Sequence, residues 1–426
     1  MERSDYRDLF VPADILLPVN CDMKKWSVVA CDQHTSEPEY WERVDEFVGS
    51  APSTLRMMLP EHTYNFPNLE ELVSDTKASM AEYEAGGVFE VCENSYVYVE
   101  RELYNGRLRR GIVGALDLEC YDFAENTKPA VRATEGTVVE KLPIRIRLRE
   151  GAPIELTHVL VLVDDPDMTL IEPLSDKKEE MHKLYDFELM EKGGHITGHR
   201  IAGALAERVK DSVAALADSK RFNGHYGLDN EPVMVLATGD GNHSLATAKV
   251  CWENLKPTLS EEERKKHPAR YALVEIVNIR DSSLEFQPIN RVVFDIDPEV
   301  MVEAMLEFFP DSYLGPGGYH EICFVHGEQT GIISLPKDSG ALAIGALSKF
   351  LDEYVPDVGG RIDFVHGDDV VVKLSQKPRR LGFVLPAIDK GNLFLSIIQD
   401  GALPRKTFSM GGSNDKRFYL ECRRIR

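Results

Sequence analysis

The sequence has few cysteines and no long apolar run. Its seven cysteines are scattered along 426 residues and are never spaced as a C-x-x-C pair, which indicates reduced thiols rather than a disulfide framework. No stretch approaches the roughly 20 consecutive apolar residues that a membrane helix needs, and the first residues lack the apolar core of a signal peptide. We therefore expect a cytoplasmic protein that is neither secreted nor membrane-spanning.

Basic residues are scarce relative to acidic ones. Lys and Arg number 49 against 71 Asp and Glu, which gives a formal net charge of -22. Binding to the backbone of DNA or RNA needs clustered Lys and Arg. The composition therefore argues against nucleic acid as the main partner and leaves a small-molecule substrate as the expectation.

The length and the hydrophobic content predict more than one packed lobe. The chain is 43% hydrophobic and is longer than a single core usually grows. No repeat of roughly 20–50 residues is present, which argues against a solenoid or a propeller. We treat residues 1–426 as one unit with two lobes, 1–175 and 176–426, joined at a soft boundary. The oligomeric state is not predicted.

Hydrophobic periodicity predicts a mixture of helices and strands. Helices are expected where apolar residues recur three or four apart, over residues 69–85, 177–190, 202–217, 244–254 and 298–308. Strands are expected in β-branched and aliphatic runs, over residues 96–103, 111–121, 156–163, 233–237, 271–279, 291–294, 321–324, 381–385 and 393–398. Because Arg145, Arg147 and Arg149 alternate with apolar residues, we interpret them as the wet face of a further strand. The predicted fold is mixed α/β (α+β), with mixed sheets and flanking helices.

The most informative segment lies between the strand expected at 233–237 and the helix expected at 244–254. It reads Gly-Asp-Gly-Asn-His-Ser at 239–244, and strand-turn-helix junctions are where α/β proteins bind ligands. Gly239 and Gly241 permit a sharp turn and close approach of a ligand to the backbone. Ser244, if it caps the helix, leaves the first N–H groups facing a phosphate or carboxylate.

Two side chains of this loop have chemistry to offer. Asp240 is a candidate to hold Mg²⁺ or to accept a proton from a substrate hydroxyl, and His243 to donate to an anionic oxygen or to shuttle a proton. The alternative is structural: Asp240 and Asn242 build a turn, Ser244 caps the helix and His243 bonds a backbone carbonyl. The segment matches neither a Walker A loop nor a G-x-G-x-x-G fingerprint.

The chain resembles the domain-of-unknown-function family 1015 of bacteria and archaea over nearly its whole length. The matching segments are 32–41 (Asp-Gln-His-Thr-Ser-Glu-Pro-Glu-Tyr-Trp), the hairpin at 96–99 and 111–114, the core at 240–243 and the tail at 403–408. The family's usual core, Asp-Gly-His-His-Arg, is similar to loops of the ParB and sulfiredoxin superfamily, some members of which bind nucleotide phosphates and phosphorylate free serine. The resemblance implies a ParB/sulfiredoxin-like core plus a second lobe, and ADP or ATP with Mg²⁺ as ligands.

The core departs from the family pattern at two positions. Residues 240–244 read Asp-Gly-Asn-His-Ser, so Asn replaces the first His and Ser replaces the Arg. The loss of the Arg removes a bidentate phosphate partner. Arg200, Arg291 and Arg405 are candidates to replace it.

Further candidates lie outside this loop. His195 and His199 are spaced like metal ligands on a helix, but three nearby glycines and the lack of an internal Glu argue against a zinc-protease site. These glycines form either a loop that brings His195, His199 and Arg200 near the site or a plain turn. The resemblance implies that Arg132 contacts an anion and that Glu135 is a general base or metal ligand.

Two polar segments near the chain ends each have two interpretations that the sequence supports equally well. Residues 32–36 follow a strand expected at 27–30, and they are either ligand contacts or the cap of the next helix. Arg405 and Lys406 either close the pocket with positive charge or form an ordinary basic turn.

These observations favour a phosphotransferase that acts as a kinase of a free hydroxyl-bearing metabolite. Its catalytic residues would be Asp240, His243 and Glu135, with Asp240 also as a Mg²⁺ ligand. Its ligand- and phosphate-binding residues would be Gly239, Gly241, Asn242, Ser244, Arg132, His195, His199, Arg200, Arg405 and Lys406. One alternative is a non-catalytic regulatory protein that binds a nucleotide or metabolite. Another is a metal-dependent hydrolase that uses Asp240, His243 and either His195 or His199.

Overall fold

The computed structural model describes residues 3–35, 37–124, 127–340, 342–387, 389–404 and 406–426. The chain forms two compact units. The first comprises Met1–Ala133, Thr137–Leu284 and Gly411–Arg426, and the second comprises Thr134–Gly136 and Glu285–Met410. This division differs from the boundary expected near residue 175, because strands on both sides of that residue belong to one sheet of the first unit.

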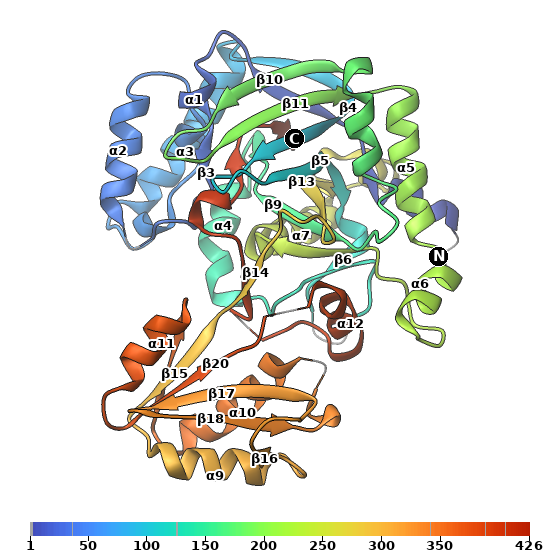
Figure 1. Ribbon diagram of the computed structural model, residues 1–426. Helices are drawn as coiled ribbons and strands as arrows, with labels where there is room; N and C mark the ends of the chain where they lie inside the picture. The colour runs from blue at the N-terminus through green and yellow to red at the C-terminus, as the bar shows by residue number, and fades with distance from the viewer. Residues whose placement is uncertain (1–2, 36, 125–126, 341, 388, 405) are drawn as a thin grey trace. The chain divides into compact units, whose positions relative to one another are not determined.

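A large mixed sheet with flanking helices organises the first unit (Figure 1). The strand order is β6-β7-β12-β9-β13-β5-β4-β2-β23-β8, with β1 paired to β5, β11 to β4 and β10 to β11. The strands are β1 Phe10–Val11, β2 Ala13–Pro18, β4 Phe89–Glu102, β5 Leu108–Asp117, β6 Tyr121–Asp122, β7 Val131–Arg132, β8 Ile154–Leu156, β9 Val159–Val163, β10 His182–Glu188, β11 His195–Ile201, β12 Leu236–Asp240, β13 Tyr271–Asn278 and β23 Cys422–Arg424. Parallel and antiparallel pairs occur together, so the expected mixed α/β fold is confirmed.

The helices of the first unit pack around this sheet. They are α1 Met23–Trp26, α2 Pro38–Val48, α3 Leu69–Ala85, α4 Leu142–Arg149, α5 Ala204–Leu216, α6 Ser219–Tyr226, α7 Asn242–Leu255 and α8 Glu261–Lys266. A separate two-stranded pair joins β3 Val28–Val29 to β22 Phe418–Tyr419, which ties the end of the chain to its beginning.

The strongest periodic patterns are confirmed. Helix α3 begins and ends at the expected residues, and α5 and α7 lie within two residues of theirs. Strand β9 is buried at every position, as expected of an apolar run inside a sheet. The hairpin β4–β5 turns at Asn105-Gly106, where Gly106 has φ 77°, a conformation that glycine adopts without a steric penalty.

Three predictions of element type are wrong. Residues 177–190 form a 3₁₀ segment and then β10, not a helix, because the edge of β11 pairs with them. Residues 393–398 lie in α12 Lys390–Asp400 rather than in a strand, because Asp389 caps a helix that buries apolar residues four apart. Residues 145–149 belong to α4, since their arginines find carboxylate partners on other elements, Glu61, Glu70 and Glu155.

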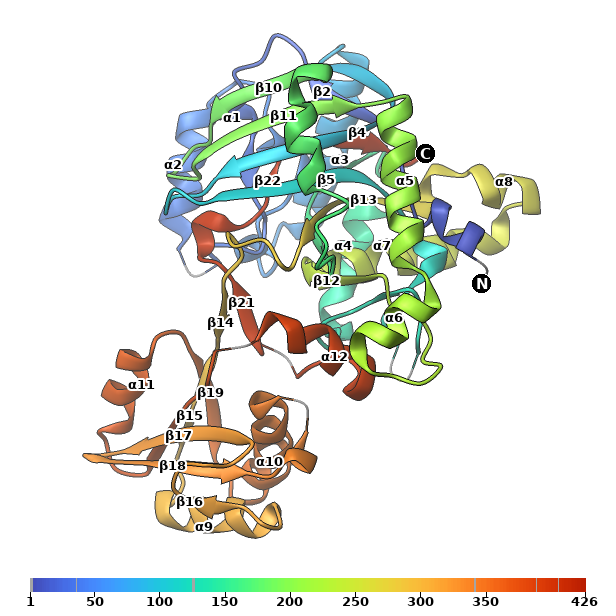
Figure 2. The ribbon, with the colours of Figure 1, turned by 45° about the vertical axis from the view of Figure 1, so that its right-hand side comes forward.

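The second unit is a smaller α/β layer. Its six-stranded sheet has the order β16-β18-β17-β20-β15-β19, and α10 and α11 pack against its strands (Figure 2). These strands are β15 Asn290–Phe294, β16 Tyr313–Leu314, β17 His320–His326, β18 Gln329–Leu335, β19 Arg361–Val365 and β20 Arg380–Val384. The unit also contains α9 Pro298–Phe308, α10 Ala343–Asp357, α11 Asp368–Ser375 and a pair of strands, β14 Phe286–Pro288 and β21 Phe408–Met410.

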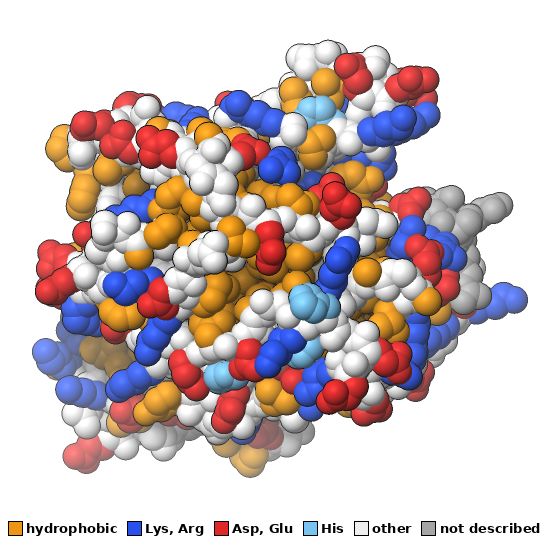
Figure 3. Space-filling view, turned by 90° about the horizontal axis from the view of Figure 1, so that it is seen from above, with side chains coloured by type: hydrophobic (Ala, Val, Ile, Leu, Met, Phe, Trp, Pro, Cys, Tyr) orange, Lys and Arg blue, Asp and Glu red, His pale blue; other side chains and the backbone are white. Residues whose placement is uncertain are grey.

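Two general features bear on partners. In the part of the chain that the structure describes, no helix has the length and apolarity that a membrane crossing demands. On the face of the molecule in Figure 3, Lys and Arg side chains lie among Asp and Glu side chains. The expectation that nucleic acid is not the main partner stays a prediction.

Candidate functional site

The loop at 239–244 joins β12 to α7 through a left-handed glycine. Gly241 is the N-cap of α7 with φ 78°, and a Cβ at this position would lie 3.0 Å from His158 Cδ2. As a glycine, Gly241 supplies no side-chain cap to α7. Ser244 lies in the first helical turn instead, with its Oγ 3.2 Å from His158 Nδ1, so the prediction that Ser244 caps the helix is wrong. The N-terminus of α7 thus keeps the positive dipole end that favours an anion.

Asp240 faces a cation from the C-terminal segment of the chain. Its Oδ1 accepts a hydrogen bond from the Gly241 N–H at 2.9 Å, and its Oδ2 lies 3.3 Å from Lys416 Nζ. The side chains of Asp240 and Lys416 are 21% and 13% exposed, so a small molecule can reach both. Lys416 therefore places positive charge at the loop in which Ser244 stands where the family has Arg.

Two buried arginines hold the segment that carries Lys416. Arg109 donates to the carbonyl of Asp415 at 2.8 Å, and Arg101 donates to the carbonyls of Asn414 and Lys416. Burial and the neighbouring Arg109 charge hold the pKa of Arg101 well below its ordinary value. Since both guanidinium groups donate to backbone carbonyls of residues 414–416, they position Lys416.

A second carboxylate lies near the loop, beside His158. Asp32 Oδ1 is 3.7 Å from His158 Nε2, and His158 Nδ1 is 2.7 Å from the Tyr419 hydroxyl oxygen. Burial would raise the pKa of Asp32, but His158, a hydrogen bond from Gln33 and Lys416 together lower it. Asp32 is therefore ionised at neutral pH, and the polar segment predicted from the sequence at 32–36 contributes it to the site.

His243 and Asn242 make contacts that the structural alternative did not include. The Val138 N–H donates to His243 Nε2 at 3.3 Å, so one ring nitrogen of this histidine accepts from an N–H group. The Thr238 hydroxyl donates to Asn242 Oδ1. These contacts tie the start of α7 to β12 and to the segment around Val138.

The structure places the histidine-rich segment elsewhere. His195, His199 and Arg200 lie on β11, and Gly193 and Gly194 lie in the turn that joins β10 to β11. Five strand spacings separate β11 from β12, which amounts to roughly 24 Å along the sheet. His195 Nε2 lies 3.0 Å from Asp186 Oδ1, and Arg200 donates to Ser95. These residues are not brought together with the loop.

The remaining cationic candidates have backbone partners. Arg132 is buried and donates to the carbonyls of Pro129 and Pro232, and burial lowers its pKa. In the second unit, Arg291 Nη2 donates to the carbonyl of Lys406 at 3.2 Å. Arg405 lies outside the described residues.

Glu135 belongs to the second unit. Its carboxylate accepts the backbone N–H groups of Lys406 and Thr407, at 3.3 and 3.1 Å. The tail segment and the 134–136 segment are thereby held together. The catalytic role of Glu135 and the ligand role of Lys406 stay predictions.

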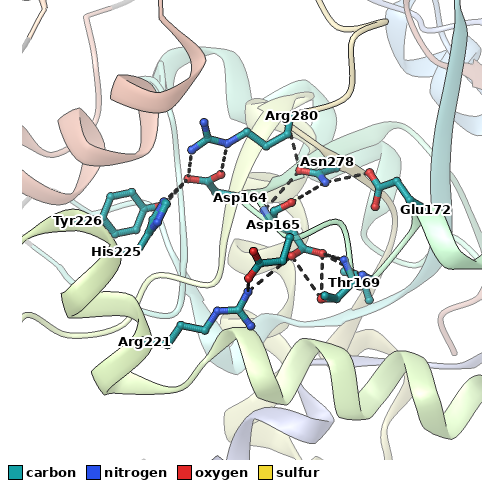
Figure 4. Close-up of polar contacts among 11 residues, drawn as sticks. Asp164, Asp165, Thr169, Glu172, Arg221, His225, Tyr226, Asn278 and Arg280 are labelled. Carbon is teal, nitrogen blue, oxygen red and sulfur yellow. Dashed lines mark hydrogen bonds and ion pairs between the residues drawn. The ribbon is translucent and has the colours of Figure 1, made fainter.

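A polar cluster at the opposite end of the sheet has a structural role (Figure 4). Asp164, at the end of β9, accepts two hydrogen bonds from Arg280 and one from the Tyr226 hydroxyl. Asp165 accepts the N–H groups of Thr169 and Leu170. The cluster fastens α6 to the carboxyl ends of β9 and β13, and Asp164 and Asp165 each face an arginine, Arg280 and Arg221.

The residues that sequence reasoning missed come from distant segments. They are His158, which follows β8, and Lys416, Arg101 and Arg109. The weak signal for Lys416 is the charged run Asp415-Lys416-Arg417, which begins three residues after Gly412. Within the described ranges, no group of three or more His, Cys, Asp or Glu side chains is placed to hold a metal, so the ligand set of the hydrolase alternative is not assembled there.

A family model decides the affiliation of the chain. The model described as "Protein of unknown function (DUF1015)" matches residues 17–354. The chain belongs to this family. The resemblance of its segments at 32–41, 96–99, 111–114 and 240–243 is thereby confirmed, whereas the ParB/sulfiredoxin-like core stays a prediction. No curated protein matches this DUF1015 member.

Several solved structures resemble it distantly. A free serine kinase in complex with AMP has 12% identity and a TM-score of 0.37, over 73% of this chain and 90% of the kinase chain. A conserved hypothetical protein from Pyrococcus furiosus has 11% identity and a TM-score of 0.36, over 74% of this chain and 95% of its own. SbnI from Staphylococcus aureus, truncated at its C-terminus, has 11% identity and a TM-score of 0.36, over 70% and 83%.

Proposed function

We propose that this DUF1015 protein transfers a phosphoryl group from ADP or ATP to the hydroxyl group of a small molecule. One observation supports this most strongly: Lys416 Nζ lies 3.3 Å from Asp240 Oδ2 beside the start of α7, where the N-cap residue is Gly241 and supplies no side-chain cap. A cation, a helix dipole and a carboxylate thus meet at one partly exposed point. Phosphoryl transfer needs little more from a protein than positioning and charge stabilisation.

Each group has a role in this proposal. The first turn of α7 and Lys416 hold the oxygens of the transferred phosphoryl group. The acceptor oxygen forms a bond to the terminal phosphorus, the bond from this phosphorus to the bridging oxygen breaks, and ADP or AMP leaves. Asp240 takes the proton of the acceptor hydroxyl.

Asp32 is the second carboxylate of the proposal. Mg²⁺ usually binds through one or two carboxylates together with phosphate oxygens, and it would neutralise charge on the nucleotide. Because its pKa is lowered, Asp32 stays ionised and suits this role better than that of a base. Asp240, next to the loop N–H groups, is left to act as the base.

The proposal predicts that Lys416→Met slows phosphoryl transfer. Phosphorus NMR with Mg²⁺ and either ADP or ATP, in the presence of a panel of hydroxy acids, hydroxy amino acids and sugars, should reveal a new phosphate ester with wild-type protein. Loss of a charge-assisted phosphate contact should lower the rate by roughly tenfold to a hundredfold or more.

A matched control is available on α5. Lys210 Nζ lies 3.2 Å from Asp8 Oδ1 and is 19% exposed, so Lys210→Met removes a comparable ion pair away from the loop and should leave transfer unchanged. Nucleotide binding without any product would identify a non-catalytic binding protein. Turnover that needs a transition metal and no nucleotide would identify a hydrolase. Either result would overturn the proposal.

A further inference from the structure

A cavity of about 140 Å³ lies beside the first turn of α7 in the first unit. Mainly apolar side chains line it. They include three flexible ones, those of Met57, Met58 and Met80. Its polar part includes His158, Ser244 and Tyr419, which are linked by hydrogen-bond contacts. A cavity of about 150 Å³ can hold a benzene-sized ligand, so this one has room for a compact apolar group.

The cavity also contains an incompletely satisfied cation. Arg149 lines it, with Nη1 2.7 Å from Glu155 Oε2. Arg423 binds the same carboxylate at 2.6 Å, so two guanidinium groups share one negative charge. Arg149 Nη2 is buried and has no hydrogen-bond partner among the described residues. A buried donor without a partner is costly, and a carboxylate of a ligand would satisfy both the donor and the excess charge.

The chemistry of the lining favours reversible binding. Burial, with the nearby charges of Asp32 and Glu61, raises the pKa of the Cys31 thiol to about 12. The thiol is therefore protonated at neutral pH and a poor nucleophile. The polar part of the cavity adjoins the loop at 239–244, since a Cβ at Gly241 would lie 3.0 Å from His158 Cδ2.

We propose that this cavity binds the phosphoryl acceptor, and that the acceptor is a small hydroxy acid with an apolar body. The apolar body occupies the methionine-lined space, the carboxylate meets Arg149, and the hydroxyl lies by His158 and Ser244 next to the loop. The role as acceptor rests on the proposed function. The binding of an apolar hydroxy acid does not.

Calorimetry with three probes tests the binding. The probes are 3-phenyllactate, 2-hydroxy-4-methylpentanoate and lactate. At least one of the two larger acids should bind wild-type protein at least about tenfold more tightly than lactate, which lacks the apolar body. Arg149→Met should weaken that binding by about tenfold or more, whereas Arg147→Met, on the same helix but 44% exposed and paired with Glu70, should leave it unchanged.

A second variant keeps the test sharp if Arg149→Met unfolds. Met80→Phe narrows the cavity and preserves every charge. It should weaken the binding of the two larger acids more than the binding of lactate. Equal binding of all three acids, no binding of any, or binding that none of the variants changes would overturn the inference. Binding that follows these expectations without phosphoryl transfer would leave the cavity assignment intact and contradict the proposed function.

Discussion

Replacement of Asp240 by Asn is expected to lower kcat for phosphoryl transfer by about 10²–10⁴-fold, the usual contribution of a general base. The substitution keeps the shape of the side chain and the Oδ1 acceptor for the Gly241 N–H. It removes the negative charge 3.3 Å from Lys416, and in the proposed site this charge repels the nucleotide phosphates. The affinity for ADP or ATP should therefore be unchanged or higher while turnover is lost.

This divergence between binding and turnover separates a catalytic role from a structural one. A residue that only shapes the loop would weaken nucleotide binding and transfer together. Asp8→Asn is the control for loss of a lysine-paired carboxylate away from the loop, because Asp8, which is 71% exposed, pairs with Lys210. Wild-type kcat in Asp240→Asn would contradict the assignment of Asp240 as the base.

The largest stability effect is expected for Arg417→Met. Arg417 is 1% exposed and binds the buried carboxylates of Glu275, at 2.8 Å, and Glu421. These two charges outweigh the effect of burial and raise the pKa of Arg417. After its removal, Glu421 keeps only a hydrogen bond from the Tyr185 hydroxyl among these contacts. Glu275 keeps the distant charge of Arg109, whose Nε lies 3.8 Å away. Loss of one partner from a buried ion pair typically costs about 3–5 kcal/mol of unfolding free energy.

Denaturant unfolding followed by tryptophan fluorescence measures this effect, since all three tryptophans, Trp26, Trp41 and Trp252, lie in the first unit. Arg56→Met, which removes a more exposed pair with Asp45, should cost less than about 1 kcal/mol. A similarly small cost for Arg417→Met would contradict the account of this cluster.

The sequence predicts elements best where a local pattern and burial agree. Helix α3 and strand β9 are of this kind, because their apolar spacing alone decides which face is buried. The segment at 145–149 was predicted as a strand because alternation of Arg and apolar residues fits a strand as well as it fits a helix. Its helical state depends on partners such as Glu61 and Glu155, which are distant in sequence.

The candidate site could be predicted in part. The loop at 239–244 is recognisable because glycines and polar residues interrupt a buried strand and an amphipathic helix. The polar segment at 32–36 is recognisable for a similar reason. Lys416 is not, because its position depends on carbonyl contacts to Arg101 and Arg109 on β4 and β5. The position of a charge that such long-range contacts fix cannot be predicted from the neighbouring sequence.

Thermal unfolding with ADP, ATP and pyrophosphate, each with Mg²⁺, tests the central claim most directly. A ligand at about 100 times its dissociation constant adds about 2.7 kcal/mol of stability. We expect at least one of these phosphates to raise Tm in wild-type protein and in Lys210→Met, and to raise it much less in Lys416→Met. No shift with any phosphate, or an equal shift in Lys416→Met, would contradict a phosphate site at the start of α7.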